Sequence, residues 1–137
     1  MEIASKTELF WLVLTLILTA TFWVPYIVQL IFQLGPIQAV WDPTGAHPHD
    51  QDWALRAKRA HYNAVENLAV FAPLVILIAF LDASTPTTVF AAKAYFFLRA
   101  AHYVIHIFAV PVVRTVVFLL GYVCQLAIGL SILNVLA

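Results

Sequence analysis

A cation, an amide and a carboxylate recur at helical spacing in the stretch 56–74, which reads RAKRAHYNAVENLAVFAPL. If this stretch is a helix, Arg59, Asn63 and Glu66 fall within about 60° of arc on one face, and Arg56 precedes them on the same side. A guanidinium can clamp a carboxylate, and a carboxylate such as Glu66 can pair with an ammonium. This face can therefore either hold an ionic ligand or fix the register of a neighbouring helix.

Two later segments carry further polar stripes at the same spacing. One stripe holds Tyr95, Arg99, His102 and His106, and the other holds Arg114, Phe118, Gly121 and Gln125. A charged group that faces lipid costs about 3 kcal/mol or more near the centre of a bilayer, so we expect the stripes to face protein or an aqueous cavity. For the same reason we expect Glu66 and Arg99 to neutralise each other across two helices.

The polar residues gather toward one side of the membrane, and this favours a binding site over a purely structural role. The members of this set are Arg56, Arg59, Asn63, His102, His106 and Arg114. Together they predict a cationic pocket that opens to the cytoplasm and holds an anionic ligand. The alternative is that they only stabilise contacts between helices. Helix register can, however, be fixed with far fewer charges.

The elements that must position these residues are membrane-spanning helices. The chain is 64% hydrophobic and only 10% charged, and its zero net charge gives no reason to expect nucleic acid as a partner. A span needs about 20 apolar residues, and four segments qualify: 8–33, 54–81, 86–108 and 111–136. We therefore predict an all-α, integral membrane four-helix bundle that forms a single domain over residues 1–137, with a bend in the first helix at Pro25.

The connections between these segments predict an orientation. Residues 34–53 form a long polar loop, 82–85 a short turn, and Ala109 and Val110 a tight link. Four spans put the long loop on the same side as Arg56, Lys58, Arg59 and Arg114. Because cytoplasmic segments carry an excess of basic residues, we expect the 34–53 loop in the cytoplasm.

The run RAHYNAVEN at 59–67, closed by Phe71 and Pro73, resembles the second-helix signature of the MAPEG family, the membrane-associated proteins of eicosanoid and glutathione metabolism. RAAHY at 99–103 is similar to the family's third-helix Arg-x-x-His element. Pro111 followed by Arg114 and Thr115 is similar to its fourth-helix corner. The resemblance covers residues 55–135 and is closest to microsomal glutathione transferases, in a bacterial branch of the family that would lie in the inner membrane.

The resemblance implies a homotrimer that binds glutathione as co-substrate between neighbouring subunits, near the cytoplasmic face. In this comparison Arg59, Asn63 and Glu66 hold glutathione, with Glu66 placed to meet its amino group. Arg114 lies by the sulfur, where it stabilises the nucleophilic thiolate, and Thr115 can donate a hydroxyl hydrogen bond to it. The other pocket candidates for glutathione binding are Arg56, Arg99, His102 and His106.

Three positions depart from the family pattern and keep other functions open. Tyr62 and Phe118 replace an arginine and a tyrosine of several members, and His106 replaces a tyrosine. We therefore weigh three hypotheses. The first is a glutathione transferase acting on lipophilic electrophiles, with lipid hydroperoxide reduction as a further activity. The second is a non-catalytic trimer that binds lipids or other ligands and resembles the lipoxygenase-activating branch of the family. The third is a proton-coupled transporter.

The loop segment 47–52, which reads HPHDQD, carries residue types that ligate metals. Its short spacing and Pro48 fit no familiar site, so we expect a solvated loop and no metal. His61 points away from the face that holds Arg59 and Glu66, and we place it outside the site.

Overall fold

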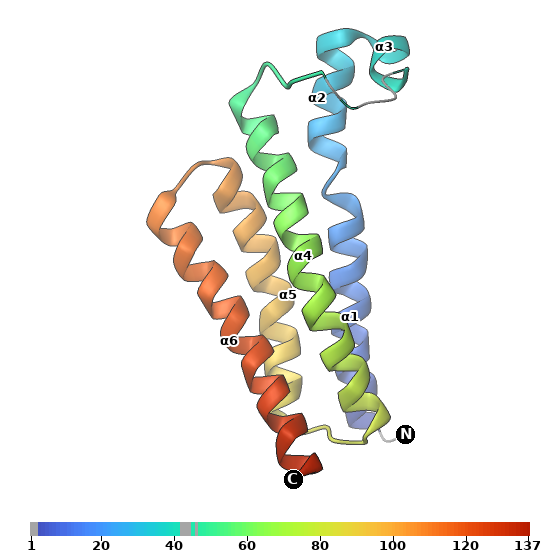
Figure 1. Ribbon diagram of the computed structural model, residues 1–137, viewed down its shortest axis with the longest axis vertical. Helices are drawn as coiled ribbons and strands as arrows, with labels where there is room; N and C mark the ends of the chain where they lie inside the picture. Colours follow the sequence, from blue (N-terminus) through green and yellow to red (C-terminus); the bar gives the residue numbers. More distant parts are fainter. Residues whose placement is uncertain (1–2, 42–44, 46) are drawn as a thin grey trace.

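The structure of the chain is a computed structural model that describes residues 3–41, 45 and 47–137. Helices account for nearly all of the described residues (Figure 1). In chain order they are α1 (Ile3–Thr21), α2 (Val24–Leu34), α3 (Pro36–Val40), α4 (Asp52–Phe80), α5 (Pro86–Ile107) and α6 (Pro111–Leu136).

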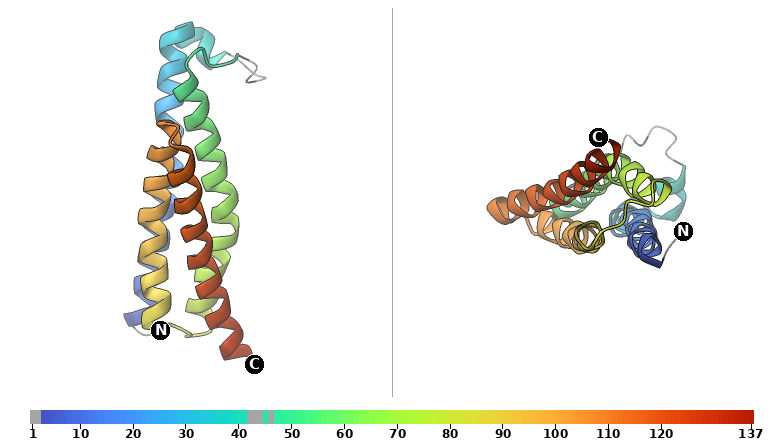
Figure 2. Two further views of the ribbon diagram at one scale, coloured as in Figure 1. Left: turned by 90° about the vertical axis from the view of Figure 1, so that its left-hand side faces the viewer. Right: turned by 90° about the horizontal axis from the view of Figure 1, so that it is seen from below.

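The long helices run side by side as an elongated bundle (Figures 1 and 2). α1 and α2 follow one another as a single broken rod, α5 packs against α1, α4 and α6, and α4 also packs against α2. The start of α1 and the end of α6 lie at one end of the bundle, while α3 lies at the other end (Figure 1). The segment between α3 and α4 includes residues 42–44 and 46, which fall outside the described part.

The predicted bend in the first helix is confirmed. α1 ends at Thr21 and α2 begins at Val24, with Pro25 in its first turn. A proline inside a helix removes one backbone donor and collides with the preceding turn, and so the break falls just before Pro25. The loop prediction missed α3, a helix of only 5 residues that begins at Pro36.

The two short connections are confirmed where they were expected. Thr85 caps α5 through a reciprocal capping box with Thr88, and Pro86 occupies the first turn. Asp82 in the first connection and Ala109 in the second have positive φ angles of 50° and 58°. These left-handed residues let the chain reverse within a few positions, so α5 and α6 start close to the helices before them.

Small residues bring α4 close to the α1–α2 rod. Ala54, Ala57, Ala60 and Ala64 are all buried and pack with Phe22, Tyr26 and Tyr103. A second buried cluster lies deeper, where Phe71 of α4 stacks on Tyr95 of α5 with ring centroids 3.7 Å apart. These contacts set the spacing of α4, α5 and α6 at the predicted site.

In the described part of the chain, three helical segments are long and apolar enough to cross a membrane: Lys6–Leu34, Asp52–Phe80 and Pro111–Leu136. The fourth predicted span, 86–108, does form a helix, α5, but α5 is not among these three. Its polar stripe lowers its apolar content, and most of that stripe is turned into the bundle, where Tyr95, Arg99 and His102 are buried.

Candidate functional site

A cavity of about 200 Å³ opens where α4, α5 and α6 meet. Its lining residues are Asn63 of α4, His102 and His106 of α5, and Arg114, Thr115 and Phe118 of α6. The structure thus brings together five of the nine residues that the sequence singled out for binding or catalysis. Four of them, Asn63, His102, His106 and Arg114, are buried or half-buried near the end where α5 and α6 connect, and Thr115 lines the cavity from an exposed position.

Positive charge surrounds this cavity. Arg114 lines the cavity, and Arg99 is buried beside it, where it donates a hydrogen bond to the lining residue Asn63. None of the lining side chains is acidic. A cavity with this field attracts anions and repels cations.

Arg99 is buried beside the cavity, with 2% of its surface exposed. Its Nη1 donates a 3.3 Å hydrogen bond to Asn63 Oδ1. The guanidinium also lies over the rings of Tyr95, at 5.0 Å, and Phe118, at 5.5 Å, where the aromatic faces attract it. Nε and Nη2 of Arg99 have no hydrogen-bond partner. These two donors are buried without an acceptor among the described residues.

The expected ion pair between Glu66 and Arg99 is wrong. Glu66 is exposed, and Arg99 instead contacts the amide of Asn63 and two aromatic rings. Aromatic faces and one amide oxygen hold the guanidinium without a carboxylate, so the expectation that burial demands a countercharge within the chain did not hold.

Gly121 of α6 makes room for this arginine. A Cβ atom at Gly121 would come within 2.5 Å of Arg99 Nη2, which is closer than real Cβ contacts come. At Gly129, two turns further along α6, the nearest atom would be 3.9 Å away. A larger side chain is therefore excluded at Gly121, which packs against the Arg99 side chain, but not at Gly129.

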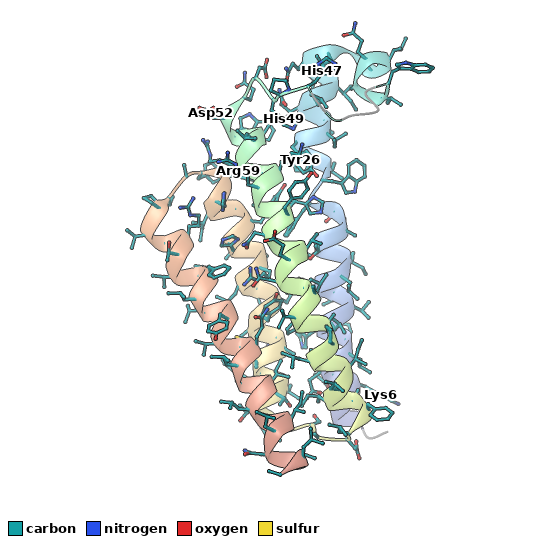
Figure 3. The ribbon with its side chains drawn as sticks, viewed as in Figure 1. Lys6, Tyr26, His47, His49, Asp52 and Arg59 are labelled. Carbon is teal, nitrogen blue, oxygen red and sulfur yellow. The ribbon has the colours of Figure 1, made fainter. Side chains whose placement is uncertain are left out.

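The remaining candidates lie around the cavity without lining it. Arg59 and Glu66 are exposed on α4, with Arg59 near the end where α5 and α6 connect (Figure 3). Arg56 Nε donates a 2.8 Å hydrogen bond to the carbonyl of Ile107. Because carbonyls at a helix C-terminus have no partner within the helix, this contact also caps α5.

Two lining residues have hydrogen-bonding states that matter for chemistry. Thr115 Oγ1 donates to the carbonyl of Pro111 at 3.2 Å, a bond within its own helix. The hydroxyl must therefore rotate before it can donate to a ligand. His106 Nδ1 is buried and has no partner, so its ring makes no competing bond through that nitrogen.

A polar network that sequence reasoning missed joins α2, α4 and the loop before α4. Tyr26 Oη and His61 Nδ1 are 2.8 Å apart. His49 Nδ1 donates to Gln29 Oε1 at 2.7 Å, and Gln29 Nε2 donates to Asp50 Oδ1 at 2.5 Å. The histidine that had been placed outside the site thus fastens α4 to α2. No amphipathic signal marks it, because its partner lies 35 residues away in sequence.

An apolar groove of about 400 Å³ runs between α4 and α6, nearer the end that holds the C-terminus. Its lining includes Val70, Leu74, Leu126 and Leu130, with Gln125 as a polar member. Gln125 Nε2 bonds to the carbonyl of Asn67 and to the Tyr95 hydroxyl, at 3.1 and 3.3 Å. In the described part of the chain, no three histidine, cysteine, aspartate or glutamate side chains gather as a metal site would need.

Fold and site together define an all-helical membrane protein with a cationic cavity at one end of its helix bundle. The chain belongs to the MAPEG family, because the MAPEG family model matches residues 9–134 of its 137 residues. No curated protein and no solved structure matches it. Membership confirms the resemblance seen at RAHYNAVEN and supports a role in glutathione or eicosanoid metabolism at a membrane.

Proposed function

We propose that the protein is an integral membrane glutathione transferase that joins the glutathione thiolate to lipophilic electrophiles, and that the same thiolate reduces lipid hydroperoxides. The observation that carries the proposal is the cavity itself, which has Asn63, His102, His106, Arg114 and Thr115 on its walls and no acidic side chain among its lining residues. Glutathione carries two carboxylates, one ammonium and one thiol, so a cationic cavity suits its carboxylates.

The roles of the cavity residues follow from their chemistry. Arg114 stabilises the thiolate by its charge, because the thiolate rather than the thiol is the nucleophile. Arg99 offers two unpartnered donors behind Asn63, and these suit a carboxylate. His106 or His102 accepts the thiol proton, since a neutral imidazole has one free acceptor nitrogen. Thr115 turns its hydroxyl from Pro111 to the sulfur.

The site is completed by neighbouring copies of the chain in a homotrimer. A small-molecule site usually measures about 300–1,000 Å³, whereas the cavity of one chain measures about 200 Å³. Glu66 and Arg59 are exposed on a helix that is apolar enough to cross a membrane. A charge facing lipid is costly, so we assign both residues to a subunit boundary, where Glu66 meets the glutathione ammonium.

α5 is the fourth span in this proposal, and the loop 34–53 is cytoplasmic. The 22 residues of α5 extend about 33 Å, enough to cross about 30 Å of hydrocarbon. Lipid does not meet its buried polar residues Tyr95, Arg99 and His102, since α1, α4 and α6 pack around it. The whole chain then acts as one membrane domain, which we place in the bacterial inner membrane.

A second function is favoured by the groove between α4 and α6. Its lining is apolar apart from Gln125 and the Tyr122 hydroxyl, which suits an acyl chain or another lipophilic molecule. In a transferase this groove holds the electrophile. In a non-catalytic trimer that resembles the lipoxygenase-activating branch, it holds the lipid that is the true ligand.

Turnover in detergent separates the two functions. If the protein is a transferase, purified protein should conjugate glutathione to a small aryl halide, at a rate that saturates as the glutathione concentration rises. If the protein is a non-catalytic lipid-binding trimer, fatty acids or lipids should co-purify with it and no conjugation should be detected. Protein that neither binds glutathione nor turns over would end the enzyme proposal.

A further inference from the structure

A cavity of about 360 Å³ lies at the loop end of the bundle, between α2 and the residues that start α4 (Figure 1). Its volume falls within the range of about 300–1,000 Å³ that is usual for small-molecule sites. It shares no lining residue with the cationic cavity. A ligand here is therefore independent of whether the protein uses glutathione.

The charge of this cavity is opposite to that of the cationic one. Among the described residues that line it, Asp50 is the only charged one. The neighbouring His49 does not offset this charge, because burial, and then the charge of Lys58, lowers its pKa below 6.5 against the opposing effect of Asp50. Lys58 itself does not line the cavity, and its Nζ lies 5.9 Å from the centroid of the Tyr62 ring. The cavity therefore favours a cation.

Hydrogen bonds hold the Asp50 carboxylate at the wall of the cavity. Gln29 is 8% exposed, and its Nε2 donates to Asp50 Oδ1 at 2.5 Å and to Gln33 Oε1 at 3.0 Å. Gln33 Oε1 also accepts from the backbone N–H of Asp50 at 3.1 Å, and Gln33 Nε2 donates to the carbonyl of Pro48 at 3.0 Å. Within the described part of the chain, no hydrogen bond reaches Asp50 Oδ2. This oxygen is free to contact a ligand.

The rest of the lining favours an organic cation over a metal ion. Pro25, Val28 and Phe32 recur at helical spacing on α2, and Trp53 lines the cavity from the first turn of α4. Aromatic faces attract ammonium groups, especially quaternary ones. A metal site would need several carboxylate, histidine or cysteine ligands, and no group of three is found among the described residues.

The cavity lies where two helical segments that can cross a membrane have their ends. Lys6–Leu34 ends one residue after Gln33, and Asp52–Phe80 begins one residue after Gln51. The polar residues of the cavity are therefore at the level of lipid headgroups. Phe32, one turn of helix or less from this end, is 86% exposed, and it provides an apolar surface that continues toward the hydrocarbon.

We propose that this cavity binds the ammonium headgroup of a zwitterionic phospholipid, with Asp50 Oδ2 as the partner of the positive charge. Phe32 and Trp53 place aromatic rings beside the ammonium, and an acyl chain follows Val28 and Phe32 along α2. Ethanolamine and choline headgroups both carry the required charge. The N–H groups of ethanolamine can also donate to the side-chain oxygen of Gln51, which lines the cavity.

The test measures lipid binding to the whole protein in detergent by native mass spectrometry. The lipids are phosphatidylethanolamine, phosphatidylcholine and phosphatidylglycerol with the same acyl chains, and the last has glycerol in place of the ammonium. Asp50→Asn removes the charge and keeps an oxygen that can accept from Gln29. Asp52→Asn is the matched control, because it removes the same charge two residues away, from an exposed side chain that does not line the cavity.

Asp50→Asn should weaken the binding of phosphatidylethanolamine and phosphatidylcholine by about tenfold, as expected for the loss of one contact between charged groups. Binding of phosphatidylglycerol should not change, and Asp52→Asn should leave all three lipids unaffected. Phe32→Leu keeps an apolar side chain but removes the ring. It should weaken the two ammonium lipids by a smaller factor of about two to five and leave phosphatidylglycerol unchanged.

The proposal is overturned if Asp50→Asn binds the ammonium lipids as tightly as the unaltered protein does, or if it loses phosphatidylglycerol to the same extent. Free ethanolamine and choline are tested separately by thermal unfolding. If they stabilise the unaltered protein while Asp50→Asn leaves lipid binding unchanged, the ligand is a soluble amine and the assignment to a phospholipid is wrong. If Asp50→Asn does not fold, Phe32→Leu decides the matter by the same comparison of lipids, because this side chain is outside the core.

Discussion

At the scale of single residues, Arg99 organises the cationic cavity. Its guanidinium is held by one amide oxygen and two aromatic rings, and two of its nitrogens have no partner. A buried donor without an acceptor costs about 1–3 kcal/mol. In the proposed function, a glutathione carboxylate that reached these donors would recover part of that cost.

Gly121→Ala tests the arrangement around Arg99. The new methyl group collides with Arg99 Nη2, so we expect a loss of about 1–3 kcal/mol in stability, as for other overpacked sites, together with weaker glutathione binding. Gly129→Ala, on the same helix, meets nothing nearer than 3.9 Å. It should be neutral or stabilising by up to about 1 kcal/mol. Equal thermal unfolding of the two variants would contradict the account.

Arg114→Ala tests the proposal that Arg114 stabilises the glutathione thiolate. Without this guanidinium the pKa of the bound thiol should rise toward about 8.5, its value in water. Each unit of rise leaves roughly tenfold less thiolate at neutral pH. The pH profile of kcat/KM should accordingly move to higher pH, with activity partly recovered in alkaline buffer. A pH profile of kcat/KM that Arg114→Ala leaves unchanged would show that Arg114 does not stabilise the thiolate.

At the scale of elements, α2 and α4 are joined by the network of Tyr26, His61, His49, Gln29 and Asp50. The network lies at the loop end of the bundle, where Tyr26 and His49 are labelled in Figure 3. Burial lowers the pKa of His49 below its usual 6.5, the charge of Lys58 lowers it further, and Asp50 opposes both effects. The network is therefore built around a neutral His49.

Lowering the pH should weaken this hydrogen-bond network. Because the pKa of His49 is lower in the folded chain, its contribution is present above about pH 6.5 and is lost as the pH falls through the folded value. We expect the backbone at 47–51 to lose protection against hydrogen exchange in mildly acidic buffer, once each rate is divided by the intrinsic rate at that pH. His49→Gln keeps a donor for Gln29 but cannot titrate, so its exchange should vary less with pH. An identical response of the two proteins would assign the effect to another group.

At the scale of the whole molecule, the exposed charges on α4 argue for assembly. Glu66 and Arg59 stand on the outside of one chain, although α4 is apolar enough to lie in a membrane. Native mass spectrometry from detergent should give a protein mass three times the 15.3 kDa of one chain. Glu66→Gln should weaken glutathione binding while keeping this mass. A monomer that binds glutathione with full affinity would contradict a site shared between subunits.

The sequence predicts the helices better than it predicts the site. Long apolar runs fix α4 and α6, and Pro25 fixes the break between α1 and α2, because these signals are local. The partner of Arg99 could not be predicted, since it depends on how α4 and α5 cross in space. The need for glycine at 121 likewise depends on the path of a side chain from another helix.

Binding of glutathione to the cavity at Asn63, His102, His106 and Arg114 is the central claim, and titration followed by thermal unfolding in detergent tests it most directly. The account predicts a Tm that rises with glutathione until it saturates, because a ligand that binds only the folded state stabilises it. The rise should be much smaller in Arg114→Ala and unchanged in Gly129→Ala. A Tm that does not respond to glutathione in the unaltered protein, or a rise that Arg114→Ala leaves intact, would contradict it.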